Sequence, residues 1–408
     1  MLLFDLTSFE VHFLRVFGED TIVTGTEIDM ANILITGGAG FIGSHTADAL
    51  IARGHRVRIL DLLDPQIHGD SADFPSHLNP GAECVRGDVC ELSCVLTALK
   101  GIDAVYHFAA QTGVGQSMYD MRSYTYTNCV GTATLLEAVI KGTYPVKRLV
   151  LASSRAVYGE GTHICVAHGI VYPDVRRRED MERGQFEVRC PVCGGEVSSV
   201  PTDEDRPLKP VSVYGWTKKQ QEEQCVYMTE TFKFPVITLR YFNVYGSRQS
   251  LKNPYTGVMT VFYNRIMNGQ PIFIYERGTP LRDFVHISDV VQANLLALEE
   301  NIQRSSCINV GSGQRHSILD IAEAMARACG REVSMVDSGE FRVGDIHACI
   351  AGLARAKESL GYVPRVSLEE GMQEFIGWAE RQESVDLFDK STEELRRYNL
   401  LCRSVKSD

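Results

Sequence analysis

The sequence predicts an α/β fold, a doubly wound parallel sheet of the Rossmann type with a smaller C-terminal lobe. Two observations predict it. From Ile33 onward, apolar runs rich in β-branched residues alternate with helical patterns, which is typical of a parallel sheet covered by helices. A glycine-rich turn at residues 36–43 separates the first expected strand from the first expected helix.

The expected elements follow in order along the chain. The strands of the sheet are expected at residues 33–35, 57–60, 104–108, 148–152 and 236–240. Helices are expected at 43–53 and 93–100, and a further helix carries Tyr214 between the last two strands. After about residue 244 the pattern becomes irregular, with short helices expected at 258–268, 287–300 and 318–328. This stretch suits a lobe that closes over the carboxyl edge of the sheet, where ligands of such sheets bind.

The chain therefore divides into four expected parts. Residues 1–29 precede the strand that normally opens such a domain, and we expect an extension with a frayed or loosely docked conformation. Residues 30–243 form the sheet domain, with an inserted loop at 160–202. Residues 244–383 form mainly the C-terminal lobe, and residues 384–408 form a tail.

Composition excludes several classes of function. The chain has 408 residues, 44% of them apolar, and a net charge of −11, which argues against a nucleic-acid partner. It has no apolar stretch of the roughly 20 residues that a membrane span needs, and its start lacks the pattern of a signal peptide. We expect a cytoplasmic protein. Its 12 cysteines are scattered, so we expect reduced thiols or metal ligands more than disulfides.

The glycine-rich turn predicts a dinucleotide site. Gly37, Gly40 and Gly43 let backbone amides approach a pyrophosphate at the positive end of a helix. Asp61 ends the second strand, where a carboxylate hydrogen-bonds a ribose 2′-hydroxyl and repels a 2′-phosphate, so NAD is favoured over NADP. Asp88 is expected near the adenine. Each of these features has a simpler alternative. The glycines serve only a tight turn, Asp88 is an exposed turn residue, and His107 is a histidine packed at the end of a strand.

Tyr214 and Lys218 predict a hydride-transfer site. One helical turn places the phenol and the ammonium on the same face. Lowering a tyrosine pKa from about 10 to about 7 needs roughly 4 kcal/mol. A single charge at about 5 Å supplies roughly 3 kcal/mol at an effective dielectric constant of 20. We therefore expect Lys218 and an oxidised nicotinamide to ionise Tyr214 near neutral pH.

With these residues, the chain resembles the extended short-chain dehydrogenase/reductase family, specifically its NAD-dependent nucleotide-sugar epimerases and dehydratases. The resemblance covers roughly residues 31–380. It implies that Tyr214 is the acid/base, that Lys218 holds the nicotinamide ribose and that Ser154 hydrogen-bonds the reacting sugar hydroxyl. The motifs that carry it are Thr36-Gly-Gly-Ala-Gly-Phe-Ile-Gly43, Gly87-Asp88-Val89, His107-Phe-Ala-Ala110, Asn128 before Gly131-Thr132, Val157-Tyr158-Gly159, Leu239-Arg-Tyr-Phe-Asn243, Arg282-Asp-Phe-Val-His286 and Arg342-x-Gly-Asp345.

The resemblance also implies two sets of binding residues. The NAD set is Gly37, Gly40, Phe41, Ile42, Gly43, Asp61, Asp88, Val89, Phe108, Ala109, Ala110, Asn128, Tyr214 and Lys218. The nucleotide-sugar set is Gln116, Ser117, Ser154, Asn243, Tyr255, Arg282, Arg342 and Asp345. The guanidinium groups of this second set suit a diphosphate.

The residues after Ser154 distinguish two reactions. In the family's 4,6-dehydratases, Asp-Glu follows the matching position and eliminates water, whereas Arg155-Ala156 stands here. Arginine stays protonated and alanine moves no proton, so we expect the 4-keto intermediate to be reduced again, which inverts C4. The alternative for Arg155 is an ion pair with a loop carboxylate.

The inserted loop predicts a metal site. Cys165-Val-Ala-His168 and Cys190-Pro-Val-Cys193 fit the tetrahedral zinc-ribbon pattern, and four protein ligands leave no position open for catalysis. We expect a structural zinc ion, with His163 as the reserve ligand. The alternative is a loop with reduced cysteines.

We therefore expect an NAD-dependent 4-epimerase of a nucleoside-diphosphate hexose. Overall likeness favours a deoxythymidine-diphosphate sugar such as dTDP-L-rhamnose over a UDP sugar. Two alternatives stay open: a dehydratase or reductase of the same family, and a non-catalytic NAD-bound scaffold that docks a partner through the zinc ribbon. A homodimer built on the helices that flank Tyr214 is expected.

Overall fold

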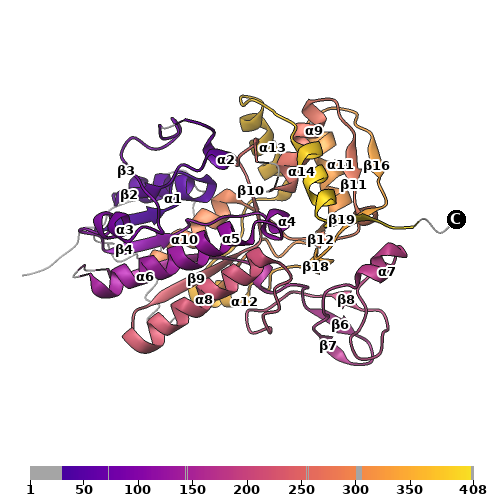
Figure 1. Ribbon diagram of the computed structural model, residues 1–408, viewed down its shortest axis with the longest axis horizontal. Helices are drawn as coiled ribbons and strands as arrows, with labels where there is room; N and C mark the ends of the chain where they lie inside the picture. The colour runs from indigo at the N-terminus through magenta and orange to yellow at the C-terminus, as the bar shows by residue number, and fades with distance from the viewer. Residues whose placement is uncertain are drawn as a thin grey trace, which may run out of the picture.

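The computed structural model describes residues 30–71, 73–142, 144, 146–253, 255, 257–299 and 306–405. The predicted extension at residues 1–29 lies outside these described residues. Within them, no helix combines the length and the apolar character that crossing a bilayer would require. Figure 1 shows a sheet domain and a second lobe side by side, with the inserted segment projecting below both.

The sheet domain is built on seven parallel strands. Their order is β3-β2-β1-β4-β5-β9-β14, so the connections wind in both directions from β1 and confirm the predicted doubly wound sheet. The strands are β1 (Asn32–Thr36), β2 (Arg56–Asp61), β3 (Glu83–Arg86), β4 (Ala104–His107), β5 (Arg148–Ser154), β9 (Val236–Tyr241) and β14 (Ser306–Val310).

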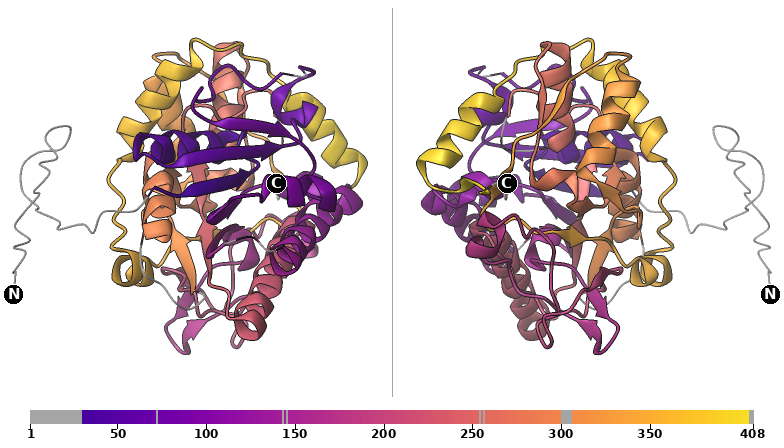
Figure 2. Two further views of the ribbon diagram at one scale, coloured as in Figure 1. Left: turned by 90° about the vertical axis from the view of Figure 1, so that its left-hand side faces the viewer. Right: turned by 90° about the vertical axis from the view of Figure 1, so that its right-hand side faces the viewer.

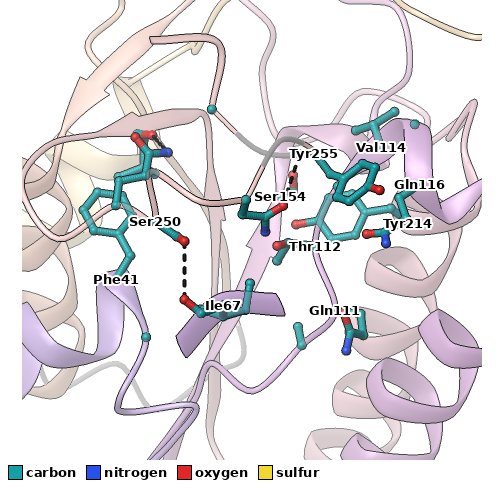
Figure 3. A pocket seen from close by; sticks show the side chains of 18 of the residues that line it. Phe41, Ile67, Gln111, Thr112, Val114, Gln116, Ser154, Tyr214, Ser250 and Tyr255 are labelled. Carbon is teal, nitrogen blue, oxygen red and sulfur yellow. Dashed lines mark hydrogen bonds between the residues drawn. The ribbon is translucent and has the colours of Figure 1, made fainter. Parts of the chain in front are cut away.

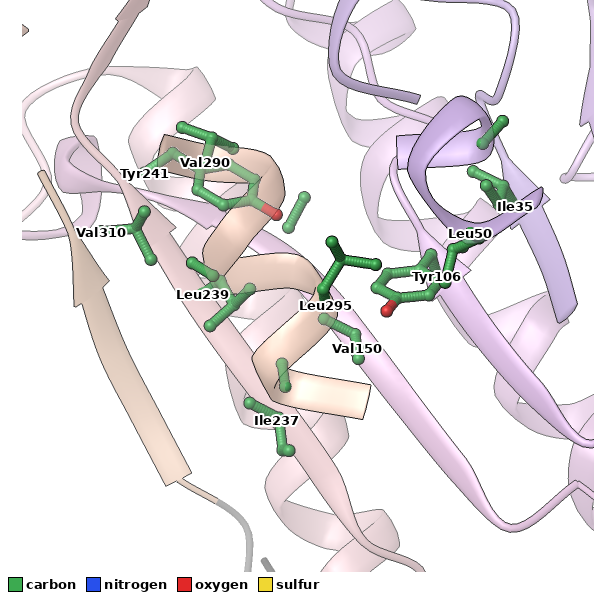
Figure 4. Packing of buried hydrophobic residues seen from close by; sticks show 14 of the residues in the cluster. Ile35, Leu50, Tyr106, Val150, Ile237, Leu239, Tyr241, Val290, Leu295 and Val310 are labelled. Atoms are coloured by element: carbon green, nitrogen blue, oxygen red, sulfur yellow. The ribbon is translucent and has the colours of Figure 1, made fainter. Parts of the chain in front are cut away.

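Helices cover both faces of this sheet because successive side chains of a strand point to opposite faces. Ile33 and Ile35 pack on one face, together with the helices α1, α10 and α12, whereas Leu34 packs on the other face with α3, α6 and α8. Figure 4 shows part of the first cluster, in which Leu50 and Val290 meet the strands. The helices are α1 (Phe41–Ala52), α3 (Leu92–Ala98), α6 (Gly131–Lys141), α8 (Val213–Phe232), α10 (Ile287–Glu299) and α12 (Ala354–Leu360).

The second lobe has its own core. Aromatic and aliphatic residues such as Phe262, Ile274 and Phe375 form it. Its elements are β10 (Asn243–Tyr245), α9 (Val258–Met267), β11 (Ile272–Ile274), β12 (Leu281–Arg282), β13 (Phe284–His286), β15 (His316–Ser317), α11 (Ile318–Ala328), β16 (Met335–Asp337), β17 (Glu340–Arg342), β18 (Ala348–Cys349), α13 (Leu368–Ala379), α14 (Phe388–Arg397) and β19 (Leu401–Arg403).

Two parts of the chain differ from the expected division. The strand β14 and the helix α10, within the predicted lobe 244–383, return to the sheet domain: β14 pairs with β9 and α10 packs on α1. The pattern around Ile308 is too short and too interrupted by polar residues to reveal a seventh strand. The predicted tail 384–408 contains α14 and β19, and β19 pairs with β17 of the lobe.

The inserted loop folds as a small module. It contains β6 (His163–Cys165), β7 (Gly169–Val171), α7 (Arg178–Glu182) and β8 (Ser198–Ser199), and its three strands form an antiparallel sheet. Short helical segments line the connections of the sheet domain: α2 (Pro65–His68), α4 (Val114–Ser117), α5 (Met121–Tyr124), a π-helix (Thr125–Val130) and a 3-10 helix (Arg155–Val157).

Candidate active site

A cavity of about 1060 Å³ opens along the carboxyl edge of the sheet, between the sheet domain and the lobe. Its walls come from the loops that follow β1, β2, β4, β5 and β9, and from the lobe on the other side. Figure 3 shows Ser154 and Tyr214 close together in it, with Gln116 and Tyr255 beside them. The structure therefore brings the predicted reacting residues and most of the predicted binding residues into one space.

One end of the cavity is formed by the glycine-rich turn. Helix α1 begins after Gly40, and no side chain caps it, so its first amides stay open toward the cavity that Gly40 and Phe41 line. A Cβ atom at Gly43 would lie 2.5 Å from the carbonyl oxygen of Gly37, so only glycine permits this close turn. These features fit a pyrophosphate group.

The two predicted carboxylates lie at the same end. Asp61 is buried, accepts hydrogen bonds from the backbone amides of Ala39 (3.0 Å) and Leu63 (2.9 Å), and lines the cavity. Asp88 accepts one from the amide of Cys90 (2.8 Å) and also lines the cavity. The remaining predicted NAD residues that line it are Gly37, Ile42, Gly43, Val89, Phe108, Ala109 and Ala110. This end therefore offers amides and carboxylates, which fit a dinucleotide.

Two predicted binding residues are not among those that line the cavity. The Asn128 side chain is buried and donates to the Gln111 carbonyl (3.1 Å) and to the Thr217 hydroxyl (2.9 Å). The Ser117 hydroxyl accepts from the amide of Tyr214 (3.0 Å). Their polar atoms are occupied within the protein, so both support the loops around the cavity instead of facing it.

His107 is a histidine packed at the end of its strand, which was the alternative interpretation of this residue from the sequence. Its ring nitrogens lie 2.7 Å from the Thr36 hydroxyl and 2.9 Å from the Thr132 hydroxyl. Burial lowers the pKa of His107 to about 3, so the ring stays neutral. It holds β4 to its neighbours and carries no charge.

Tyr214, Lys218 and Ser154 meet at the middle of the cavity. Ser212 caps the start of α8 by accepting from the amide of Gly215 (3.0 Å), which places Tyr214 in the first turn and Lys218 one turn later. The Lys218 ammonium donates to the carbonyl of Ala152 (2.9 Å) and lies 6.0 Å from the centre of the Tyr214 ring. Ser154 hydrogen-bonds the Tyr214 hydroxyl.

The surroundings of Tyr214 in the protein alone do not favour an ionised phenol. Burial raises the pKa of Tyr214, and the opposing effects of the Ser154 hydrogen bond and the Arg155 charge do not overcome it. Burial also lowers the pKa of Lys218 to about 8, which weakens its positive charge as a partner. The expectation left out the desolvation of both groups but also counted the charge of an oxidised nicotinamide, so it stays a prediction for the NAD-bound protein.

The lobe supplies a cluster of charged groups opposite. Asp345 accepts from Arg282 (3.0 Å) and Arg342 (2.7 Å). Burial works against the charge of Asp345, yet the two guanidinium groups hold the pKa of its carboxyl well below the usual range. Arg282 is buried and also binds the carbonyls of Ile346 and His347, whereas the Arg342 side chain is 46% exposed. Arg342 is therefore the freer of the two to meet a phosphate.

Comparison with known proteins places the chain in a family. The family model described as the NAD dependent epimerase/dehydratase family matches residues 33–176 and 192–311. The chain belongs to this family. Its relatives include the dTDP-L-rhamnose 4-epimerase of Burkholderia thailandensis, 37% identical over 87% of this chain and 97% of that protein. A putative UDP-glucose 4-epimerase of Methanocaldococcus jannaschii is 31% identical over 85% of this chain and 97% of that protein.

Solved structures of epimerases share this fold. The UDP-N-acetylglucosamine 4-epimerase of Methanobrevibacter ruminantium superposes with a TM-score of 0.70 at 27% identity, covering 87% of this chain and all (100%) of that one. The NAD complex of the Thermus thermophilus UDP-glucose 4-epimerase gives 0.69 at 27% identity, covering 86% and 100%. The fold of the sheet and the lobe is thus that of solved epimerase structures.

Arg155, from which the sequence analysis predicted an epimerase instead of a dehydratase, lines the cavity. Its Nε atom donates to the amide oxygen of Asn243 (2.9 Å), so its contact in the cavity is with an amide. An arginine fixed in this way offers no group that could remove a proton from a sugar.

The inserted module departs from the family pattern. Residues 177–191, which the family model leaves unmatched, lie within it. Its four candidate ligands, Cys165, His168, Cys190 and Cys193, place their ligand atoms within 4.8 Å of one another. The Sγ atoms of Cys165 and Cys193 are 3.8 Å apart, and His168 Nδ1 lies 3.6 and 3.7 Å from the Sγ atoms of Cys165 and Cys190.

These distances fit one metal ion. Zinc bonds to sulfur of about 2.3 Å in a tetrahedron separate two sulfur atoms by about 3.8 Å. His163, the expected reserve ligand, is not one of these four: its Nδ1 lies 3.1 Å from the Gly161 carbonyl oxygen and its Nε2 lies 3.8 Å from the Glu160 carboxylate. The candidate ligands are therefore the four residues of the two C-x2-C/H pairs, without His163.

Sequence reasoning missed two features of the site. The Arg176 side chain, only 4% exposed, forms an ion pair with Glu276 and donates to the carbonyl of Asp345 (3.0 Å), so it links the module to the charged cluster. The helix α14, counted as tail, lines the cavity with Ser391, Thr392 and Leu395. Neither contact has a sequence signal, because each joins segments far apart in the chain.

Proposed function

We propose that this protein is an NAD-retaining 4-epimerase of a nucleoside-diphosphate hexose. The observation that carries the proposal is the meeting of Ser154, Tyr214 and Lys218 in one cavity, between a dinucleotide-like end and a cluster of arginines. Relatives at 37% and 31% identity bear 4-epimerase names, which supports the same reaction.

The chain's own residues account for the proton steps. Tyr214 would take the proton of the sugar 4-hydroxyl and later return it, while Ser154 holds the same hydroxyl by a hydrogen bond. The open amides of α1 and the Asp61 carboxylate would hold NAD, with Lys218 at its nicotinamide ribose. When bound, NAD supplies a hydride acceptor and donor. The ring's positive charge adds to that of Arg155, which favours the ionised phenol that burial disfavours in the free protein.

The nucleotide sugar would lie across the charged cluster. Arg342 and Asn243 would hold the diphosphate, which leaves the sugar at Tyr214 and the nucleoside among the aromatic residues of the lobe, such as Phe273 and Tyr275. We propose dTDP-L-rhamnose as the first substrate to test, because the relative with 37% identity carries that name.

Incubation of the purified protein with a panel of dTDP-, UDP- and GDP-sugars tests this function. The expected result is interconversion of 4-epimers, followed by NMR, with NAD bound throughout and no net change in its redox state. Net NADH formed with each turnover would contradict the proposal. A 4-keto product lighter than its substrate by one water molecule would instead identify a dehydratase.

We also propose that Cys165, His168, Cys190 and Cys193 hold one structural zinc ion. The mutual distances of the ligand atoms support it. Metal analysis should find about one zinc per chain. Cys190→Ser should lower the zinc content and the melting temperature far more than the turnover, whereas Cys84→Ser, at an exposed free cysteine, should change neither. Full zinc content in the Cys190 variant would remove the assignment.

We further propose a homodimer formed by helices α6 and α8. Apolar side chains on this side of the molecule are exposed, among them Val130, Trp216 and Tyr227. Light scattering should give twice the chain mass. A charged substitution, Tyr227→Lys, should produce monomers, and a monomeric wild-type protein would contradict the proposal.

A further inference from the structure

The C-terminal helix α14 lies across the cavity of the proposed active site. Figure 1 places it between α9 of the lobe and α4 of the sheet domain. Ser391, Thr392, Leu395 and, after the helix, Leu400 line the cavity together with Phe388. Figure 2 shows this helix in yellow at the side where the two domains meet. A segment counted as tail therefore forms one wall of the site.

The start of α14 is fixed to the lobe. The Phe388 ring stacks on that of Phe273 at 5.9 Å with an interplanar angle of 15°. The buried Arg265 guanidinium lies 4.8 Å from the centre of the Phe388 ring and pairs with Asp386 (3.1 Å) and Asp389 (3.3 Å). This stacking and charge pairing set the first turn beside the proposed nucleoside position.

The end of α14 is fixed to both sides of the cavity by one carboxylate. Oε2 of Glu394 accepts from the hydroxyl of Tyr119 (2.8 Å), which belongs to the sheet domain, and from that of Tyr255 (2.6 Å), which belongs to the lobe. The Tyr398 ring stacks on that of Tyr119 at 4.6 Å. Burial, and then Glu394, raises the pKa of Tyr255 to about 12, so the phenol keeps its proton and donates.

Leu395 lines the cavity next to the helix α4 of the sheet domain. A Cβ atom at Gly115 would lie 3.2 Å from Cδ2 of Leu395, so the leucine packs in the space that this glycine leaves. Gly115 lies on α4, and the hydroxyl of Ser117 on the same helix holds the amide of Tyr214 (3.0 Å). Leu395 thus packs against the short helix that holds the start of α8, and it lines the same cavity as Tyr214.

We propose that α14 is part of the nucleotide-sugar site, with Leu395 in contact with the sugar and Glu394 as the positioning residue that fixes the helix across the cavity. This inference rests on the proposed function. Leu395 would cover an apolar face of the sugar and exclude water from it. Glu394 touches no substrate, so its removal should loosen binding without disturbing the proton transfer at Tyr214.

Steady-state kinetics of three variants test the proposal, with the NAD-loaded protein and whichever nucleotide sugar the wild type converts. Glu394→Ala should raise KM about tenfold, which corresponds to about 1.4 kcal/mol, with kcat within about twofold. Glu394→Gln should recover most of this loss, because its amide oxygen can accept both hydroxyls. Glu393→Ala, at the exposed neighbouring position, is the matched control and should equal the wild type.

Leu395→Ala distinguishes an effect on sugar binding from an effect on nucleoside binding. It should raise KM for the nucleotide sugar about fivefold, which is the size of a lost apolar contact, while the Kd of free dTDP or UDP in calorimetry stays unchanged. This variant removes no hydrogen bond, so it carries the test even if Glu394→Ala does not fold. Wild-type KM values in both the Glu394→Ala and the Leu395→Ala variants would overturn the proposal.

The same variants distinguish this inference from the proposed function on which it rests. A wild type that converts no nucleotide sugar contradicts the proposed function, and the Kd of dTDP-L-rhamnose measured for each variant then decides the role of α14. A weaker Kd in Leu395→Ala supports the placement of the helix. An equal Kd, or no binding by the wild type, overturns it.

Discussion

The two ends of the cavity are built in different ways. The dinucleotide end comes from one continuous stretch, in which a strand, a glycine turn and a helix present backbone amides and Asp61. The sugar end combines segments from the whole chain: Gln116 from α4, Arg342 from the lobe and Leu395 from α14. The first end depends on local backbone geometry, and the second on side chains that distant contacts hold in place.

This difference predicts separable defects. Changes at the dinucleotide end should weaken NAD binding and leave the affinity for a nucleotide sugar nearly unchanged. Changes in the contacts of α14 should do the reverse. Tyr214 and Lys218 lie between the two ends. Substitutions there should change the reaction or the charge of the site, while NAD and the nucleotide sugar still bind.

The largest expected effect is that of Tyr214→Phe. Loss of the hydroxyl removes the group that would transfer the proton, so kcat should fall by about 10³ to 10⁴. The ring still fills the same buried space, so the melting temperature and the NAD content should stay unchanged. Kinetics together with the absorbance of bound NAD measure both, and a Phe variant with wild-type turnover would remove the role assigned to Tyr214.

Lys218 should make stability depend on pH. Burial lowers its pKa from 10.5 to about 8, so between these values the unfolded chain holds the proton that the folded protein has lost. Stability therefore rises with pH across this window, and below it the buried charge costs about 3 kcal/mol. Lys218→Met has no such charge to bury.

Denaturant unfolding of the NAD-free wild type and Lys218→Met at pH 7 and pH 10 measures this cost. The other titrating groups are shared, so the difference between the two proteins isolates Lys218. The wild type should gain about 2.5 kcal/mol relative to the variant as the pH rises. A difference that stays constant with pH would show that the folded environment leaves the charged form undisturbed.

The backbone geometry of the dinucleotide end could be predicted from the sequence because its signals are local. Gly37, Gly43 and Asp61 lie within one strand-turn-helix-strand unit, and their spacing alone carries the geometry. The fold class followed from the same regular alternation. Tyr214 and Lys218 were predicted to share a helix face, and α8 places both in the cavity.

The sugar end was predicted less completely because its contacts are long-range. Nothing in the sequence around Glu394 indicates that two tyrosines from different domains donate to it. Arg282 was expected to face a phosphate, yet backbone carbonyls and Asp345 occupy much of its guanidinium. The charge of a residue could be read from the sequence, whereas its burial and partners required the fold.

Asp61→Asn tests the dinucleotide end alone. The amide keeps the shape of the carboxylate but loses its charge and one acceptor, so one of the two backbone amides that it binds, or a ribose hydroxyl, loses a strong hydrogen bond. The affinity for NAD should fall about tenfold, or about 1.4 kcal/mol. Calorimetry with NAD and then with dTDP measures both ligands. An equal loss for dTDP would mean that the two ends are not separable.

The smallest expected effects are those of Tyr119→Phe and Tyr255→Phe, and they sharpen the account of the sugar end. Each removes one hydrogen bond to Glu394, worth about 1 kcal/mol, so KM should rise about fivefold with kcat unchanged. Tyr255 lines the cavity and was predicted to bind substrate, whereas Tyr119 is not among the residues that line it. Equal effects would mean that the Tyr255 hydroxyl acts only through Glu394. A larger effect at Tyr255 would mean that its hydroxyl also reaches the substrate, because the loss of the shared contact is the same in both variants.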